Sequence, residues 1–461
     1  MKAIMVGAAK RDITPTPDML PLPDMRGLYE GVRENEPLMV KAIVIDNGDR
    51  KFLICGWDLA GVPFPDEIRD RFEAAYGFEQ DSMLLFGTHN HMGYFCKGTK
   101  ENPSDGNGME DPHNIVMGNV EKVSAYAMAQ SMAVVADALA NMKPAKYGYG
   151  EGKSFINVNR DKLYDDGYWM QGNNWEGCSD KTLAAIKFVD YEGNLIAAIL
   201  NYAMHANSSM CSPDLDGKNK LTCGIPGIAS KMVEQYYGGD AVVLWQSGAA
   251  GNQNPYTMSV VQLYDPDGTM RQKERVPGAA YQNGVALGQQ HGMDALRTIK
   301  SIDAAKSMMK ITTEDELVYF PTQKYPDGVD LRFHRLALDN FLEWGGYIGP
   351  DDPQPEKHLV DMVPCEEEAP MKAQLILLGD IAIWGIAAEL YNEIGVKCKE
   401  ISPYKNTMIV THIGEPGVGY LLDDASTGHK VFQSYGKVRE GRNDEIITTA
   451  MLDMFEKALQ K

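Results

Sequence analysis

Residues 39–58 read MVKAIVIDNGDRKFLICGWD and decide how the fold begins. Two apolar runs, 39–46 and 51–57, flank the pair Asn47-Gly48. This pair is preferred in two-residue hairpin turns, because both central residues of the turn need a positive φ. The stretch therefore predicts a β-hairpin, with Asp58 at the end of its second strand.

Further along the chain, predicted strands run directly into polar side chains. The apolar run 82–86 continues into GTHNHMG (87–93), which contains His89 and His91. A second hairpin, 184–202, runs into His205, and a third, 372–386, is followed by Glu389. Strand ends and the loops after them are where α/β scaffolds carry their active sites.

Helical spacing of apolar residues predicts the helices between these strands. They cover residues 65–75, 117–142, 228–237, 278–299 and 443–459, and residues 321–370 read as loop with short helix. We therefore expect a mixed α/β fold, with residues 1–461 forming a single large domain. The long loops 96–116 and 346–370 are expected to shape its pocket.

Composition and charge narrow the class of protein. The 461 residues are 44% hydrophobic and 23% charged, which is typical of a globular protein. The net charge of −20 repels a phosphate backbone, so no nucleic-acid partner is expected. Seven cysteines without a CxxC motif favour reduced thiols. No apolar run of about 20 residues and no export signal are seen, so we expect a cytoplasmic protein without a transmembrane segment.

The polar residues at the strand ends form a set of potential metal ligands. His89 and His91 are two residues apart, so an extended backbone through Asn90 would put both rings on one side. A solvated turn explains such a pair equally well. Glu389 follows a core strand, where a carboxylate is costly unless it is paired or bound to a cation. With His205, these residues are a ligand set that suits zinc, although the spacing alone does not establish that they converge.

Several short segments, in order, resemble the catalytic domain of the neutral, non-lysosomal ceramidase family of zinc-dependent amidases. They are VGAAKRDITP (6–15), CGWDLAG (55–61), GTHNHMG (87–93), INVNRD (156–161), MHANSSM (204–210), QSGAAGNQNP (246–255), IAAELYNEIG (386–395) and the region 417–435. The resemblance implies a single catalytic domain and a bound Zn²⁺. It implies four zinc ligands, which are His89, His205, Glu389 and Tyr420.

The resemblance also implies three residues around the substrate amide. His91 would move a proton to the leaving amine, because its ordinary pKa of about 6.5 suits transfer in both directions. Arg160 would stabilise the oxyanion or hold a substrate carboxylate, and Tyr435 would donate to the same oxygen. A surface ion pair is the alternative for Arg160, and a turn or capping role is the alternative for Asp58, which could otherwise orient a ligand histidine.

The chain departs from the family in its small-residue loop. Asn252 and Asn254 stand where the family has aspartate and serine, so a serine nucleophile is disfavoured and hydrolysis by metal-activated water is favoured. The expected activity is therefore hydrolysis of an amide (N-acyl) bond in a small polar metabolite or a ceramide-like compound. Alternatives are a metal-dependent ester or lactone hydrolase, a lyase, and a non-catalytic binding protein with the same fold. The expected partner is a small-molecule substrate, and the sequence leaves open whether the protein forms a homo-oligomer.

Overall fold

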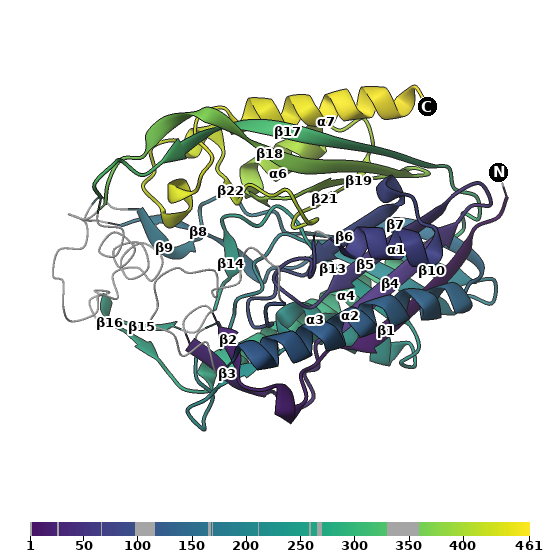
Figure 1. Ribbon diagram of the computed structural model, residues 1–461, viewed down its shortest axis with the longest axis horizontal. Helices are drawn as coiled ribbons and strands as arrows, with labels where there is room; N and C mark the ends of the chain where they lie inside the picture. The colour runs from purple at the N-terminus through teal and green to yellow at the C-terminus, as the bar shows by residue number, and fades with distance from the viewer. Residues whose placement is uncertain are drawn as a thin grey trace.

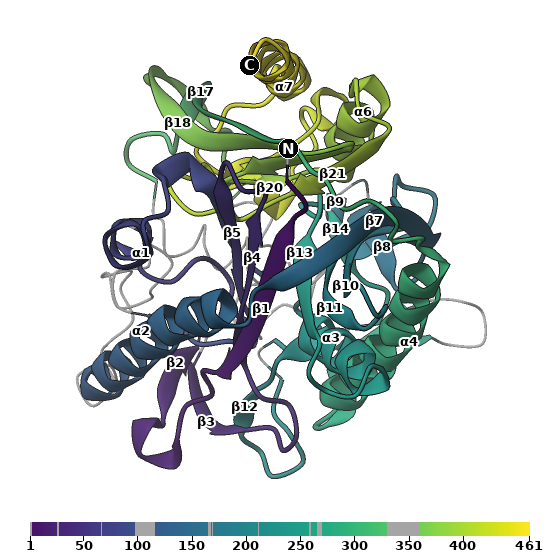
Figure 2. The ribbon, with the colours of Figure 1, turned by 90° about the vertical axis from the view of Figure 1, so that its right-hand side faces the viewer.

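The computed structural model describes residues 2–24, 27–65, 67–96, 116–164, 167, 169–210, 212–257, 260–264, 270–329 and 359–461. Two sheets pack face to face, and helices cover their outer faces (Figures 1 and 2). The mixed α/β class expected from the sequence is confirmed.

The larger sheet has the strand order β13-β11-β10-β7-β1-β4-β5-β6. Its strands are β1 (Met5–Asp12), β4 (Met39–Asp46), β5 (Lys51–Trp57), β6 (Met83–Gly87), β7 (Lys143–Lys153), β10 (Thr182–Asp190), β11 (Leu195–Tyr202) and β13 (Val242–Ser247). β4 pairs antiparallel with β5, and β10 with β11, which confirms the first two predicted hairpins. β7 pairs with β1 at its start and with β10 further on, so it joins the two halves of the sheet.

The smaller sheet has the strand order β17-β18-β19-β21. Its strands are β17 (Ile311–Lys324), β18 (Val363–Leu378), β19 (Ile381–Ile386) and β21 (Asn406–Val410). β18 and β19 confirm the third hairpin. The prediction of loop and short helix was wrong for 321–324 and 363–370, which extend the β17–β18 ribbon. Both segments are rich in polar residues and only partly buried, so they lack the apolar signal of a buried strand.

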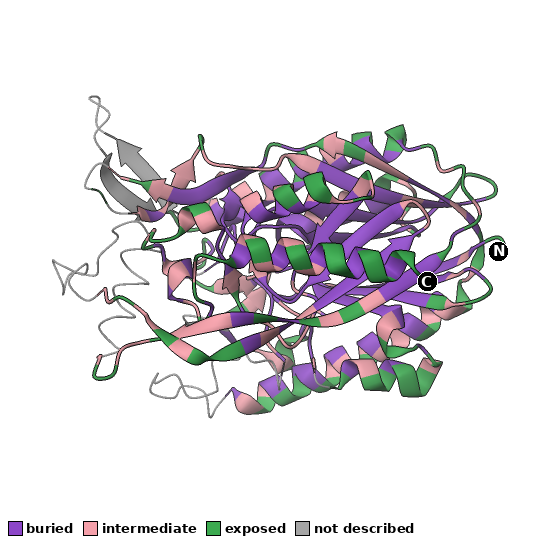
Figure 3. Ribbon diagram, turned by 90° about the horizontal axis from the view of Figure 1, so that it is seen from above, coloured by how far each residue is buried: buried purple, intermediate pink, exposed green. Residues whose placement is uncertain are grey.

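Six α-helices lie in the described part of the chain. They are α1 (Ile68–Tyr76), α2 (Met117–Ala140), α3 (Gly224–Tyr236), α4 (Ala279–Ser301), α6 (Asn392–Ile401) and α7 (Asn443–Leu459). Figure 2 shows α1 and α2 beside one half of the larger sheet, and α3 and α4 beside the other half. α6 and α7 cover the smaller sheet, and Figure 3 shows α7 with an exposed outward face above buried strands in the middle of the molecule.

The apolar core between the two sheets contains residues from both the N-terminal and the C-terminal parts of the chain. Phe86 of β6 and Ile54 of β5 belong to the same buried cluster as Ile383 of β19 and Met451 of α7. Apolar burial of this kind stabilises a fold by about 25 cal/mol per Å². The N-terminal and C-terminal strands are therefore parts of one core, and the ends of both sheets can contribute to one site.

Helix α2 is long and apolar enough to cross a membrane, by length and composition alone. Its residues Val123, Ala127 and Val134 are fully buried and pack in the cluster that contains Val44 of β4. The apolar stripe of α2 is thus accounted for by its packing on the larger sheet, as in the core helix of a globular protein.

Four small sheets complete the described structure. Their strands are β2 (Leu22–Asp24), β3 (Gly27–Val32) and β12 (Asn219–Leu221); β8 (Asn157–Leu163), β9 (Trp169–Asn174) and β14 (Gln253–Pro255); β15 (Val260–Tyr264) and β16 (Met270–Arg275); β20 (Glu389–Leu390) and β22 (Tyr420–Leu421). In the last pair, Glu389 and Tyr420 lie directly opposite each other. Most of the predicted pocket loops 96–116 and 346–370 lie outside the described residues.

Candidate metal centre

Main-chain contacts bring the ends of separate strands together at one place. Asn90, after β6, forms a parallel bridge with Ala206, after β11, and the N–H of His91 donates to the Ala206 carbonyl at 2.9 Å. The N–H of Gly251 donates to the carbonyl of Leu390 at 2.7 Å, which fixes β20 beside the small-residue loop. The side chains that follow these strands are therefore forced into one buried group.

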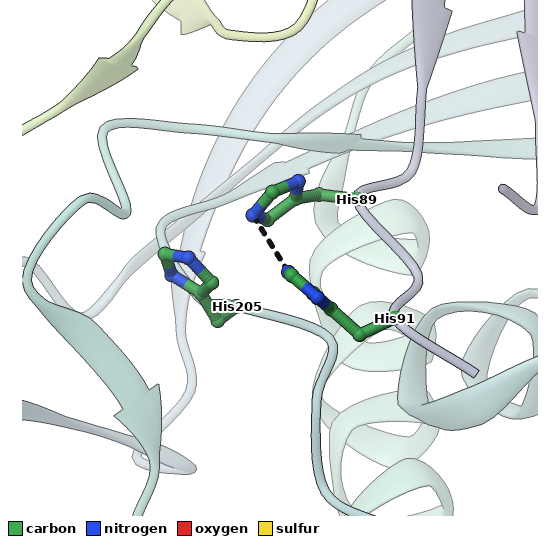
Figure 4. Close-up of side chains that lie close together, drawn as sticks. All are labelled: His89, His91 and His205. Carbon is green, nitrogen blue, oxygen red and sulfur yellow. Dashed lines mark hydrogen bonds between the residues drawn. The ribbon is translucent and has the colours of Figure 1, made fainter. Parts of the chain in front are cut away.

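The ligand atoms of this group lie at the separations that a small cation requires. His205 Nε2 is 3.0 Å from Glu389 Oε2, and His89 Nε2 is 3.4 Å from the same oxygen. Ligands about 2.0–2.2 Å from a tetrahedral zinc lie about 3.3 Å apart. Figure 4 shows that the rings of His89, His91 and His205 point toward one another, and their nitrogen atoms lie within 4.8 Å of one another.

The hydrogen bonds of His205 fix which nitrogen carries its proton. Nδ1 lies 2.6 Å from the carbonyl oxygen of Ala250, which can only accept, so Nδ1 is the donor. Nε2 then turns a lone pair toward the Glu389 carboxylate. Burial, with the nearby charge of Arg160, lowers the pKa of His205 to about 3, so the ring is neutral near pH 7. Two facing acceptors need a cation between them, and this ligand set fits a zinc ion.

His91 joins the group by a route that differs from the prediction. His89 has a φ of +56°, in the left-handed region, so the backbone is not extended at His89, although Asn90 itself forms a β-bridge. The turn at His89 nevertheless leaves Nε2 of His91 3.1 Å from Nε2 of His89. Burial lowers the pKa of His91 well below its ordinary value. His91 lies as close to His89 as the predicted zinc ligands lie to one another. Because this distance suits a ligand and a proton carrier equally, the role of His91 as a proton carrier stays a prediction.

Tyr420 and Arg160 complete one side of the group. The Tyr420 hydroxyl lies 3.4 Å from His205 Nε2 and accepts a hydrogen bond from Arg160 Nη2 at 3.1 Å. Burial, and then the negative charge of Glu389, raises the pKa of Tyr420 well above 10, whereas Arg160 lowers it. A phenolate ligand at this position would therefore need both the arginine and a metal cation.

Arg160 is a buried residue of β8 and not the surface ion pair that was the alternative. Its Nη2 also donates to the Gly251 carbonyl at 2.5 Å, and its Nη1 donates to Asn254 Oδ1 at 3.3 Å. Its buried Nε has no partner in the described part of the chain. Arg160 therefore links the small-residue loop to Tyr420 and keeps one donor free.

The two asparagines of the small-residue loop are engaged in holding it. Asn254 accepts hydrogen bonds from Arg160 and from Asn207 Nδ2, the latter at 3.0 Å. Asn252 donates to Glu393 Oε2 at 2.7 Å and accepts the N–H of Asn392, at the start of α6, at 3.0 Å. Both side chains are thus engaged in hydrogen bonds that hold the loop, and the preference for metal-activated water over a serine nucleophile stays a prediction.

Two other predicted residues lie outside the group. Asp58 accepts the main-chain N–H of Met39 at 3.0 Å, which is the capping role left open for it. The orientation of the His205 ring is instead held by its Nδ1, which contacts the main-chain carbonyls of Ala250 and Gln253. Tyr435, in the 3-10 helix η7 (Phe432–Tyr435), packs with Met170 in a neighbouring apolar cluster, so its role at the substrate stays a prediction.

His412 is the residue that the sequence analysis missed. It follows β21, and its ring stacks on that of His89, with centroids 3.7 Å apart and planes 13° apart. The signal was present, because the apolar run TMIVT (407–411) ends directly before His412, much as the predicted strands end shortly before His205 and Glu389.

A cavity of about 340 Å³ opens beside the group. Glu389 and His412 line it, and most of its other lining residues are apolar or glycine: Leu59, Ala60, Gly61, Val62, Pro63, Pro65, Tyr94, Phe95, Cys96, Ala387, Ala388, Gly414, Gly417, Val418 and Gly419. Apolar walls with a few convergent polar groups are typical of small-molecule sites.

Comparisons with known proteins find similarity to neutral ceramidases. No family model matches the sequence. A neutral ceramidase from Drosophila pseudoobscura pseudoobscura is 25% identical over 252 residues, which are 50% of this chain and 32% of that protein. The chain thus matches about a third of the length of this relative.

Two solved structures share the fold over nearly the whole chain. The neutral ceramidase from Pseudomonas aeruginosa matches with a TM-score of 0.66 and 15% identity, over 98% of this chain and 74% of that one. A ceramidase complexed with C2 matches with a TM-score of 0.65 and 15% identity, over 98% and 75%. The chain is therefore similar to neutral ceramidases, in fold over nearly its whole length and in sequence over half of it.

Proposed function

We propose that the protein is a zinc-dependent hydrolase of amide (N-acyl) bonds. One observation carries the proposal: because His205 Nδ1 donates to the Ala250 carbonyl, Nε2 of the neutral ring faces the Glu389 carboxylate at 3.0 Å as a second acceptor. A divalent cation satisfies both groups. Likeness to neutral ceramidases supports the choice of an amide bond.

The proposed ligands of zinc are His89, His205, Glu389 and Tyr420. When bound, zinc would polarise the substrate carbonyl and make water nucleophilic near neutral pH. His91, neutral and beside His89, would take a proton from the attacking water and pass it to the leaving amine. Arg160 would keep Tyr420 in place through Nη2 and offer its free Nε–H to the developing oxyanion.

The size of the cavity bears on the proposed substrate. Its volume of about 340 Å³ is near the lower end of ligand pockets, which run from about 300 to 1,000 Å³. Its apolar walls suit a hydrocarbon portion, and Glu389 is the proposed zinc ligand that lines it. We therefore favour a small N-acyl compound as the substrate. We also propose that the protein is cytoplasmic.

The test begins with metal content. Elemental mass spectrometry on the wild type, His205→Ala and Glu389→Gln should find about one zinc per chain in the wild type only. His429→Ala is the matched control, because His429 stacks on Trp169 and belongs to no described metal-ligand group. A wild type that takes up no added zinc would rule out the proposed mechanism.

The reaction is then tested on a panel of N-acyl amines with matched esters in water enriched in ¹⁸O. Amide hydrolysis places one ¹⁸O atom in the released acid and frees the amine. Cleavage of the esters without cleavage of the matched amides would favour the ester hydrolase, and an unsaturated product without ¹⁸O would favour a lyase.

A further inference from the structure

His412 is fixed by its main chain next to the loop that carries His89. Its carbonyl accepts the N–H of Gly87, at the end of β6, at 3.3 Å. The preceding residue, Thr411, donates its N–H to the carbonyl of Ser247 at 3.0 Å. The ends of β21, β6 and β13 are thus tied together, and His412 lies where the two sheets meet.

The backbone of His412 is in the left-handed region, with a φ of +60°. A glycine adopts this conformation freely, whereas a side chain makes it unfavourable. Strained residues of this kind persist where the surrounding structure holds them, and they concentrate at functional sites. The contacts of the His412 ring should therefore explain why a histidine occupies this strained position.

The contact is with His89, whose own support is weak. A metal-bound imidazole needs its second nitrogen held, so that the first points at the metal. His205 meets this need through two carbonyls at 2.6 and 3.2 Å. Among the described residues, Nδ1 of His89 has only the Ala60 carbonyl within hydrogen-bond distance, at 3.4 Å. The His412 ring, parallel to His89 within 13° and 3.7 Å away, supplies the missing restraint.

We propose that His412 is a positioning residue of the metal centre, which fixes the plane of the His89 ring by stacking and so directs its Nε2 toward Glu389. This inference rests on the proposed zinc site. His412 is not itself one of the three histidines whose nitrogens cluster in the described part of the chain, so it acts through His89. Stacking needs a flat ring and no nitrogen, which distinguishes this role from that of a ligand.

The test is a competition titration of zinc against a chromogenic chelator, with His412→Gly, His412→Asn and His412→Phe beside the wild type. The glycine and asparagine variants lose the ring and should bind zinc about 10–100-fold more weakly. The phenylalanine variant keeps a flat ring and should stay close to the wild type. Thermal unfolding of the zinc-free proteins controls for folding, because glycine and asparagine suit the left-handed backbone and should not lower the midpoint.

Two results would overturn the inference while leaving the proposed function intact. Wild-type affinity in His412→Gly and His412→Asn would show that the ring is not needed. A loss in His412→Phe as large as in His412→Gly would show that a nitrogen, and not the flat ring, matters. A wild type that binds no zinc would remove the proposed function and the positioning role together, which is a different outcome from either.

Discussion

His205 Nε2 and Glu389 Oε2 lie 3.0 Å apart, although 184 residues separate them in the sequence. The first follows β11 of the larger sheet and the second begins β20, just after β19 of the smaller sheet. Their meeting depends on the small-residue loop between them, because Ala250 holds His205 and Gly251 holds Leu390. The site is therefore a product of how the two sheets are joined.

Gly251→Ala should damage the site through this loop. A Cβ atom at Gly251 would lie 2.6 Å from the carbonyl oxygen of Glu389 and 2.9 Å from Cδ1 of Tyr391. Since the carbonyl cannot move without its residue, we expect Glu389 to shift and zinc affinity to fall at least about 10-fold. Chelator competition measures the change. Gly118→Ala in α2, where a Cβ meets nothing within 4 Å, is the control and should bind zinc normally.

Arg160→Lys should separate catalysis from metal binding. Lysine lacks the planar fork that lets Arg160 reach Tyr420 and Gly251 together, and it has no Nε donor in that place. We expect kcat/KM for the best N-acyl substrate to fall about 100-fold, with zinc content retained. Lys162→Gln on the same strand is the matched control. An unchanged kcat/KM would assign Arg160 to the scaffold alone.

Glu234→Gln should be strongly destabilising. Glu234 of α3 accepts hydrogen bonds from Lys41 Nζ at 2.9 Å and from Lys10 Nζ at 2.7 Å. Lys41 is buried, so loss of the carboxylate removes the ion-pair partner that it contacts directly, and the free energy of unfolding should fall by about 3–5 kcal/mol. Urea titration gives the value. Lys10→Gln, which removes a more exposed charge, should lower it by about 1 kcal/mol or less.

Much of the fold could be predicted because each predicted strand and helix carries its own local pattern. The hairpin at 39–58 and the helix at 443–459 are read from turn residues and apolar spacing alone. The ribbon of β17 and β18 was missed in part because its outer half is stabilised by pairing between strands and not by burial. Pairing over such distances leaves little trace in local sequence.

The residues of the candidate site likewise fall into those that the sequence predicts and those that it does not. His89, His205 and Glu389 could be found because each follows a recognisable apolar strand. The role of His412 could not, because it depends on a stack between two loops and on two left-handed residues. Likewise, no residue near Glu393 in the sequence indicates that Asn252 donates a hydrogen bond to its carboxylate.

Glu393 should make the stability of the protein depend on pH. Burial raises the pKa of this carboxyl to about 7, and the carboxylates of Asp423 and Asp161 act in the same direction. The unfolded value is about 4.5, so the folded state binds the proton more tightly. The resulting stabilisation is complete below pH 4.5 and is lost as the pH rises through 7. A difference of this size corresponds to roughly 3 kcal/mol.

Glu393→Gln should remove that dependence, because the amide keeps a polar group opposite Asn252 and does not titrate. Thermal unfolding at pH 5, 6, 7 and 8 should show the wild type losing stability relative to the variant as the pH rises. Glu400→Gln, at an exposed position on the same helix, should follow the wild type. Parallel curves for the wild type and Glu393→Gln would mean that the carboxyl is already ionised at pH 5, with Asn252 and the solvent stabilising its charge.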